Sequence, residues 1–168
     1  MAISYGHAYV ASVALGAQEA HTLRAFLEAG SHPGPSIVIA YAHCIAHGYD
    51  LRMGPQQQKR AVDSGVWPLY RWDPRRVEAG QPPLSVDSEG GKLPVSEYMT
   101  NETRFKMVEK LNPEGFARYS IEAQRIAERR MAVYRHISQL RLPGSENEKE
   151  PGAKNDSSDA GAAPGKEV

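Results

Sequence analysis

The chain has 168 residues and carries 20 basic and 20 acidic side chains, so its formal net charge is zero. This balance argues against a nucleic-acid surface built on excess basicity, and no apolar run approaches the roughly 18 residues that a membrane span needs. The first residues lack a signal-like core, and the single cysteine, Cys44, cannot form an internal disulfide, so we expect a reducing, cytoplasmic setting.

The polar residues concentrate at the C-terminal end. Residues 143–168 contain no aromatic residue and no Leu, Ile or Met. Such a segment cannot bury enough apolar surface to offset the entropy of ordering. We therefore expect a disordered polar tail after a folded body that comprises residues 1–142.

The start of the body has the pattern of a β-α-β unit. Residues 9–15 form a short apolar run that ends at Gly16, as in a strand buried on both faces. Residues 36–42 form a second such run, bounded by Pro and Gly. Between them, residues 18–29 carry apolar side chains at helical spacing: Ala20, Leu23, Phe26 and Leu27. The sequence therefore predicts an α/β fold with a parallel sheet and flanking helices.

For the rest of the body, the sequence predicts a loop over residues 43–51, a helix over 55–64 and an extended segment over 66–72. Pro68 indicates either an edge strand or pairing that begins after it. A short strand is predicted over residues 82–87 and a helical segment over 95–111.

Asn112-Pro113 then marks the start of a long amphipathic helix that reaches about residue 141. Its apolar stripe consists of Phe116, Tyr119, Ala123, Ile126, Val133, Ile137 and Leu140, with Arg130 in a polar slot. We expect this stripe to dock on the body rather than to form a separate coiled coil.

Cys44 is the residue that most suggests chemistry. It lies just past the second predicted strand, and ligands of open parallel sheets gather beyond the carboxyl ends of strands. One interpretation is a thiolate that faces a cofactor or metal. The other is a small buried hydrophobic side chain, which is the common state of a free cysteine.

The flanking residues do not favour a self-contained zinc site. His43 and His47 are four residues apart, so one helix face would present both, but Cys44 would point about 100° away and a fourth ligand is missing. No nucleophile, base and orienting group can be recognised, and no phosphate-binding Gly-rich motif occurs. The remaining conspicuous residues have ordinary structural interpretations, as packing or surface groups: Asp50, Asp63, Trp67, Trp72, Arg75, Arg76, Arg129 and Arg130.

Three stretches of the body read ISYGHAYVA at residues 3–11, PGPSIVIAYAHCIAHG at 33–48 and SGVWPLYRWDPR at 64–75. They closely resemble pyruvate:ferredoxin (flavodoxin) oxidoreductase, and the resemblance runs in unbroken order from about Ile3 to Leu140. It implies the C-terminal part of the thiamine-diphosphate-binding domain of a much longer polypeptide.

The resemblance also implies an activity and its cofactors. Enzymes of this family decarboxylate pyruvate on thiamine diphosphate with Mg²⁺, transfer the acetyl group to coenzyme A, and pass electrons through 4Fe–4S clusters to ferredoxin or flavodoxin. Cys44 matches the family cysteine that ligates the cluster nearest the thiamine cofactor. A cluster takes four cysteines, so one cysteine makes sense only within a shared cage.

The sequence also departs from the family. The Gly-Asp-Gly motif that holds the metal and the diphosphate is missing, as are the companion cysteines. We therefore expect a fragment that is catalytic only together with the remainder of the oxidoreductase. The alternatives are a non-catalytic interaction module that docks on oxidoreductase subunits, and a related enzyme for another 2-oxo acid. Without preceding strands, the sheet should also have an unpaired, apolar edge and a tendency to aggregate.

Overall fold

The computed structural model describes residues 2–143. Within this range the α-helices are α1 Glu19–Ser31, α2 Gly54–Asp63, α3 Arg75–Glu78, α4 Val95–Met99, α5 Thr103–Leu111 and α6 Pro113–Ile137. The strands are β1 Tyr9–Val13, β2 Ser36–Ala40, β3 Tyr70–Trp72 and β4 Leu84–Val86, and short 3₁₀ turns are η1 Ala2–Tyr5, η2 Ile45–His47 and η3 Leu51–Met53. The predicted tail, residues 143–168, lies outside the described residues apart from Pro143.

The four strands form one sheet in the order β2-β1-β3-β4. β1 and β2 run parallel, with Tyr9 opposite Ser36 and Val13 opposite Ala40, as the β-α-β pattern predicts. β3 and β4 are antiparallel to their neighbours. The α/β class is therefore confirmed, and the sheet is mixed because the chain re-enters it at the carboxyl end of β1, where Tyr70 pairs with Ser12.

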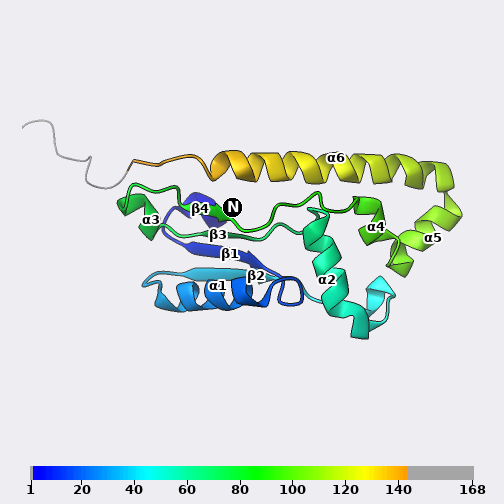
Figure 1. Cartoon of the computed structure of the whole chain (residues 1–168), viewed down its shortest axis with the longest axis horizontal. Helices are drawn as coiled ribbons and strands as arrows, with labels where there is room; N and C mark the ends of the chain where they lie inside the picture. Colours follow the sequence, from blue (N-terminus) through cyan, green and yellow to red (C-terminus); the bar gives the residue numbers. More distant parts are fainter. Residues whose placement is uncertain (1, 144–168) are drawn as a thin grey trace, which may run out of the picture.

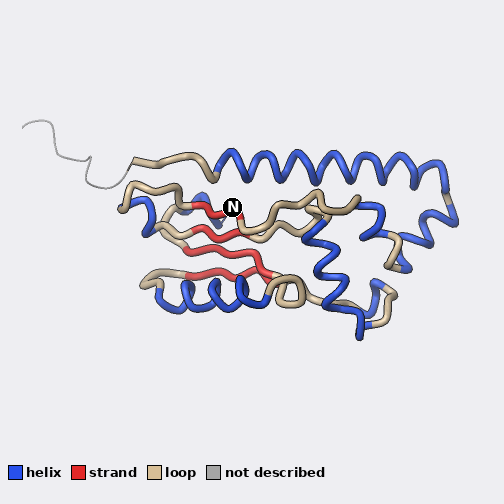
Figure 2. The backbone as a smooth tube through the Cα atoms, in the orientation of Figure 1, coloured by secondary structure: helices blue, strands red, loops and turns tan. Residues whose placement is uncertain are grey.

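Helices cover both faces of the sheet. In Figure 1, α6 runs along one side of the sheet and α1 along the other, while α2, α4 and α5 gather beyond the carboxyl ends of β1 and β2. Figure 2 shows the strands as a central layer between α6 and α1. Among residues 2–143, no helix is both long and apolar enough to cross a membrane.

Alternate residues of β1 point to these two layers. Tyr9, Ala11 and Val13 pack with Ala25 of α1, while Val10 packs in a cluster that Ile137 of α6 contacts. All five residues of β1 are buried, as predicted. β2 is different: its continuous apolar run suggests a buried strand, yet only Val38 is partly buried. The reason is its position at the edge of the sheet.

The predicted helical segment over residues 95–111 is two helices. The chain leaves the helix at Thr100 and is extended at Glu102, where φ is −110° and ψ is 128°. The side chain of Glu102 is completely buried there and accepts a hydrogen bond from Gln57 at 2.9 Å. This buried contact outweighs the local helical preference of the segment.

The long helix α6 docks on the body, as predicted, but only part of the predicted stripe, namely Phe116, Ala123 and Ile137, contacts the core. Asn112 caps it by accepting a hydrogen bond from the amide of Gly115, and it ends at Ile137, before the predicted residue 141. Its best buried positions are Phe116, Ala127 and Met131, whereas four of the predicted stripe residues are more than two-fifths exposed: Tyr119, Ile126, Val133 and Leu140. Two glycines allow this side of α6 to come close to the body, because Gly65 and Gly90 lie directly against Met131.

Candidate functional site

Cys44 lies beyond the carboxyl end of β2, where the sequence predicts it. We call residues 41–53, between β2 and α2, the Cys44 loop. The thiol is exposed and belongs to no disulfide, so the interpretation as a small buried hydrophobic side chain is wrong. Cys44 is also the residue before the 3₁₀ turn η2, and its carbonyl accepts a hydrogen bond from the amide of His47 at 3.1 Å.

The far end of this turn is fixed on another element. Gly48 has a left-handed backbone with φ of 70°, a conformation that glycine adopts at little cost. The amide of Thr103, at the start of α5, donates to the Gly48 carbonyl at 3.3 Å, and the Thr103 hydroxyl donates to the same oxygen. A Cβ on Gly48 would lie 2.6 Å from the Cβ of Thr103. The turn that carries Cys44 is therefore held by a segment 55 residues later.

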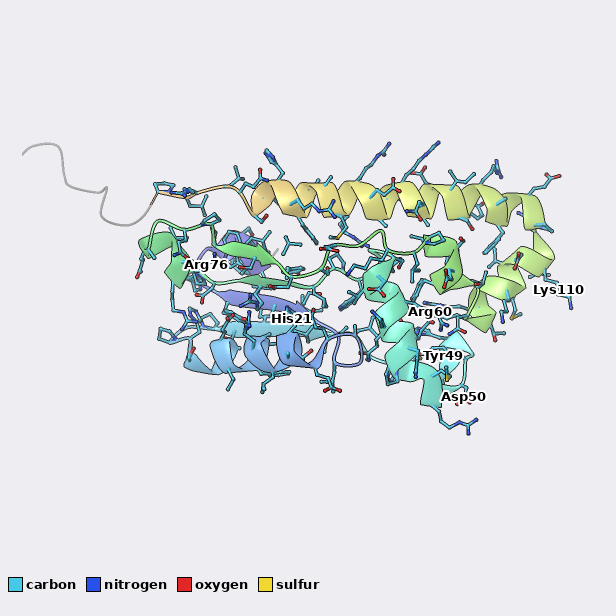
Figure 3. The ribbon with its side chains drawn as sticks, viewed as in Figure 1. His21, Tyr49, Asp50, Arg60, Arg76 and Lys110 are labelled. Carbon is cyan, nitrogen blue, oxygen red and sulfur yellow. The ribbon has the colours of Figure 1, made fainter. Side chains whose placement is uncertain are left out.

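The two histidines that flank Cys44 both contact Tyr49. His43 Nδ1 lies 3.2 Å from the Tyr49 hydroxyl, and the His47 ring stacks on Tyr49 with centroids 6.4 Å apart. Burial raises the pKa of Tyr49 above its ordinary value. Figure 3 shows Tyr49 beside α2, at the end of the molecule opposite α3. Within residues 2–143, no three His, Cys, Asp or Glu side chains gather closely enough to hold a metal ion.

A buried polar network supports this end of the fold. Gln57 of α2 donates to the carboxylate of Glu102 and, at 3.1 Å, to the carbonyl of Tyr98. Arg104 pairs with the other carboxylate oxygen of Glu102, and Asn101 donates to Gln57 at 2.7 Å. No sequence spacing signals this network, because Gln57 and Glu102 are 45 residues apart.

Two tyrosines link this network to the end of β2. The hydroxyls of Tyr41 and Tyr98 lie 3.2 Å apart. Burial raises the pKa of both, and for Tyr98 the hydrogen bond to Tyr41 and the nearby Glu102 carboxylate raise it further. The Tyr41 ring also meets Trp67 edge to face at 5.3 Å. These contacts fix the backbone three residues before Cys44.

A second charged cluster lies between α1 and the sheet, away from the Cys44 loop. Arg71 of β3 pairs with both Glu28 and Asp87, and His21 Nε2 lies 3.2 Å from Asp87. Figure 3 shows His21 between α1 and the strands. Burial opposes ionisation of Asp87, but the hydrogen bonds from His21 and Arg71 outweigh it and lower its pKa to about 2. This cluster fastens α1 to β3 and to the residue after β4.

The other conspicuous residues have structural roles. Trp67 donates to the carbonyl of Val13 at 3.1 Å, and Trp72 is buried in the sheet core. Arg75 pairs with Asp73. Arg130 is neither a solvated residue nor an ion-pair donor within the described residues: it donates to the carbonyls of Gly65 at 3.0 Å and Val66 at 2.7 Å.

A surface hollow of about 580 Å³ lies at the other end of the sheet. It is lined by residues before β1 and β2, including His7 and His32, and by Arg75. It therefore lies at the amino ends of the parallel strands and contains no residue of the Cys44 loop.

Comparison with known proteins finds similar sequences among oxidoreductases. No family model matches the chain. Curated relatives do match: the pyruvate-flavodoxin oxidoreductase of Trichormus variabilis is 51% identical over 138 residues and that of Rhodospirillum rubrum 47%, and the pyruvate:ferredoxin oxidoreductase of Moorella thermoacetica is 35% identical over 139 residues. These alignments cover 82% or 83% of the chain but 12% of each relative. By sequence, the chain is similar to one stretch of the pyruvate-flavodoxin and pyruvate:ferredoxin oxidoreductases, and this stretch makes up about 12% of their length.

Proposed function

We propose that the chain is the C-terminal portion of the thiamine-diphosphate-binding domain of a pyruvate:ferredoxin or pyruvate:flavodoxin oxidoreductase of the cytoplasm. In the complete enzyme it takes part in the oxidative decarboxylation of pyruvate to acetyl-CoA, with electrons passing to ferredoxin or flavodoxin. The observation that carries the proposal is the identity of 51% over 138 residues with a protein of that name. The thiamine diphosphate, its Mg²⁺ and coenzyme A are held by other parts of the enzyme.

In this proposal, Cys44 is one ligand of a 4Fe–4S cluster. The cluster, when bound, supplies one-electron transfer. The chain contains one cysteine, so the other three ligands come from the remainder of the oxidoreductase. Support for this role comes from the exposed thiol and from its place beyond the carboxyl end of β2, where ligands of such sheets bind.

The residues around Cys44 act on the position of its thiolate. Thr103 holds Gly48 at the end of the turn, and the amide of His47 holds the Cys44 carbonyl. A ligand that is ordered before the cluster binds loses less conformational entropy on binding. The turn therefore presents the sulfur to the rest of the cage in a fixed place.

A graft tests the function. The 138 matching residues of the Trichormus variabilis enzyme are replaced by those of this chain, and pyruvate- and coenzyme A-dependent reduction of ferredoxin or flavodoxin is measured. We expect the graft to be active and the 168-residue chain alone to be inactive. A well-folded graft that contains its clusters but does not oxidise pyruvate would overturn the proposal, as would pyruvate oxidation by the chain alone.

The role of Cys44 is tested in the same graft by electron paramagnetic resonance and iron content. We expect Cys44→Ser to remove or strongly alter the signal of one cluster and to abolish activity. Ile45→Ser is the matched control, because Ile45 is the next residue and is 82% exposed. A Cys44→Ser graft with unchanged iron content and spectra would show that Cys44 is not a ligand.

A further inference from the structure

One edge of the sheet is unprotected. β2 has the sequence SIVIA and pairs with β1 on one side only among the described strands. Natural edge strands are kept from pairing by charged residues, proline, bulges or a very short length. β2 has none of these and keeps five residues in unbroken register with β1. It has the character of an interior strand.

The opposite edge shows what protection looks like in the same fold. β4 has three residues and contacts α6. Its first residue, Leu84, is 3% exposed. β2, by contrast, presents Ile37 and Ile39 at 41% exposure, although they lie on the same face of the sheet as Val10, Trp72 and Leu84, whose cluster Ile137 of α6 contacts.

The large apolar residues of α1, the helix beside β2, face away from the sheet, which is unusual for an isolated domain. α1 packs on the sheet through Thr22 and Ala25. The stripe that the sequence predicts as its apolar face is mostly exposed: Leu23 at 62%, Phe26 at 55% and Leu27 at 66%. A surface helix normally turns such a stripe toward a core. The stripe therefore indicates a second apolar layer over α1.

The backbone of β2 defines which groups are free for pairing. The amide of Tyr9 donates to the Pro35 carbonyl, and the amide of Tyr41 donates to the Val13 carbonyl. The backbone N–H and C=O groups of Ile37 and Ile39, which lie between Pro35 and Tyr41, therefore also point toward β1. The backbone groups of Ser36, Val38 and Ala40 consequently point away from the described strands. An added strand would bond to these three residues.

We propose that β2 pairs with an extended strand of the remaining oxidoreductase polypeptide, and that Leu23, Phe26 and Leu27 pack against an apolar element joined to that strand. We call these three residues together with the free backbone edge of β2 the β2 edge surface. The inference rests on the proposed function, because the occupant is the part of the enzyme that makes up most of the relatives' length. An interior-type strand and an outward apolar helix stripe, side by side, are what a sheet exposes when its next β-α unit is taken away.

The test uses the full 168-residue chain, co-expressed with a tagged Trichormus variabilis enzyme that lacks its matching 138-residue stretch. We expect the chain to co-purify with the tagged protein. Phe26→Glu and Leu27→Glu should each lower the recovered chain by roughly tenfold, because a buried charge without a partner strongly weakens an interface. Both side chains are exposed in the chain itself, so neither change removes a core contact.

Val133→Glu is the matched control, because Val133 is 53% exposed in the middle of α6. We expect it to leave co-purification unchanged. An equal loss with Val133→Glu, or no loss with either α1 variant, would overturn the assignment of the surface. A chain that self-associates through Phe26 and Leu27 and does not bind the tagged protein would show that the occupant is a second copy, which also overturns it.

Amide hydrogen exchange tests the strand pairing directly. In the complex, we expect the amides of Ser36, Val38 and Ala40 to exchange at least tenfold more slowly than in the chain alone. The amides of Ile37 and Ile39, which face β1, should change much less. Uniform protection along the strand, or none, would contradict the pairing.

The same complex separates this inference from the proposed function. Cys44→Ser should keep co-purification and lose a cluster signal. A complex that forms through the β2 edge surface but does not oxidise pyruvate would refute the function and leave the docking intact. A grafted enzyme that is active although Phe26→Glu and Leu27→Glu leave co-purification unchanged would refute the docking alone.

Discussion

Thr103 is hydrogen-bonded to Gly48, and this contact joins the start of α5 to the end of the turn that begins at Cys44. Both the amide and the hydroxyl of Thr103 donate to the Gly48 carbonyl. Space is so tight that even a methyl group on Gly48 would overlap the Thr103 side chain. The turn and α5 are therefore one structural unit, although they are far apart in the sequence.

Gly48→Ala should disrupt this unit. The variant combines an unfavourable left-handed backbone with a steric overlap, and overlaps of this kind typically cost about 1–3 kcal/mol. Gly80→Ala is the control, because Gly80 has a similar φ of 66° but nothing within 4 Å of an added Cβ. We expect Gly48→Ala to lower the free energy of unfolding in urea by about 1–3 kcal/mol more than Gly80→Ala. Equal losses would mean that the Thr103 contact adds no constraint.

The position of Cys44 could be predicted because local signals suffice for it. An apolar, β-branched run that follows Pro33 and Pro35 identifies β2, and the residues after a strand lie at its carboxyl end by necessity. The cap at Asn112 is equally local. Both predictions are confirmed by the fold.

The buried surfaces could not be predicted in the same way. The stripe of α1 obeys helical spacing, but what it faces depends on neighbours that periodicity does not reveal. On α6, the sequence favours Ile126 and Val133, while the fold buries Ala127 and Met131 because two glycines come close to that side. The helix predicted over residues 95–111 is interrupted at Glu102, whose side chain accepts a hydrogen bond from Gln57. This contact exists only in the tertiary structure.

Glu102→Gln should destabilise the end of the fold that carries Cys44. Glu102 is completely buried between Gln57 and Arg104, and the variant removes the charge that Arg104 pairs with. We expect a loss of about 1–3 kcal/mol in the free energy of unfolding, the usual range for a buried polar group left unsatisfied, because the new buried amide NH₂ would face a donor of Arg104 or Gln57. Glu97→Gln, on the exposed side of α4, is the control and should change stability by less than about 0.5 kcal/mol. A neutral Glu102→Gln would show that Arg104 contributes nothing here.

The stability of the chain should fall in acid through Asp87. Its pKa is held at about 2 by His21 and Arg71 against the effect of burial, compared with an ordinary value near 3.9. Because the folded pKa is the lower one, this stabilisation is complete above about pH 4 and disappears as the pH falls toward 2. Its size is about 2 kcal/mol at neutral pH.

Asp87→Asn tests the assignment. The difference in the free energy of unfolding between the original chain and the variant should be largest above pH 4 and should shrink steadily between pH 4 and 2. Asp50→Asn is the control, because Asp50 pairs with Arg52 in solvent and such pairs contribute little. A difference that does not vary across this pH range would assign the effect of Asp87 to something other than its charge.

The chain on its own should associate in a concentration-dependent way, because two of its apolar stripes have no cover within the described structure. The larger share of the effect should come from α1, which lies beside an unprotected strand edge.

Sedimentation velocity and thermal unfolding at several protein concentrations measure this association. We expect higher oligomers and a broad transition for the original chain, and a shift toward monomer for the double variant Phe26→Glu/Leu27→Glu. The α6 variant Ile126→Glu/Val133→Glu, with two residues of comparable exposure, should shift the distribution less. A sharp, cooperative transition of a monomer at ordinary concentration would contradict the expectation, since it would mean that the exposed edge of β2 is tolerated in water without a partner.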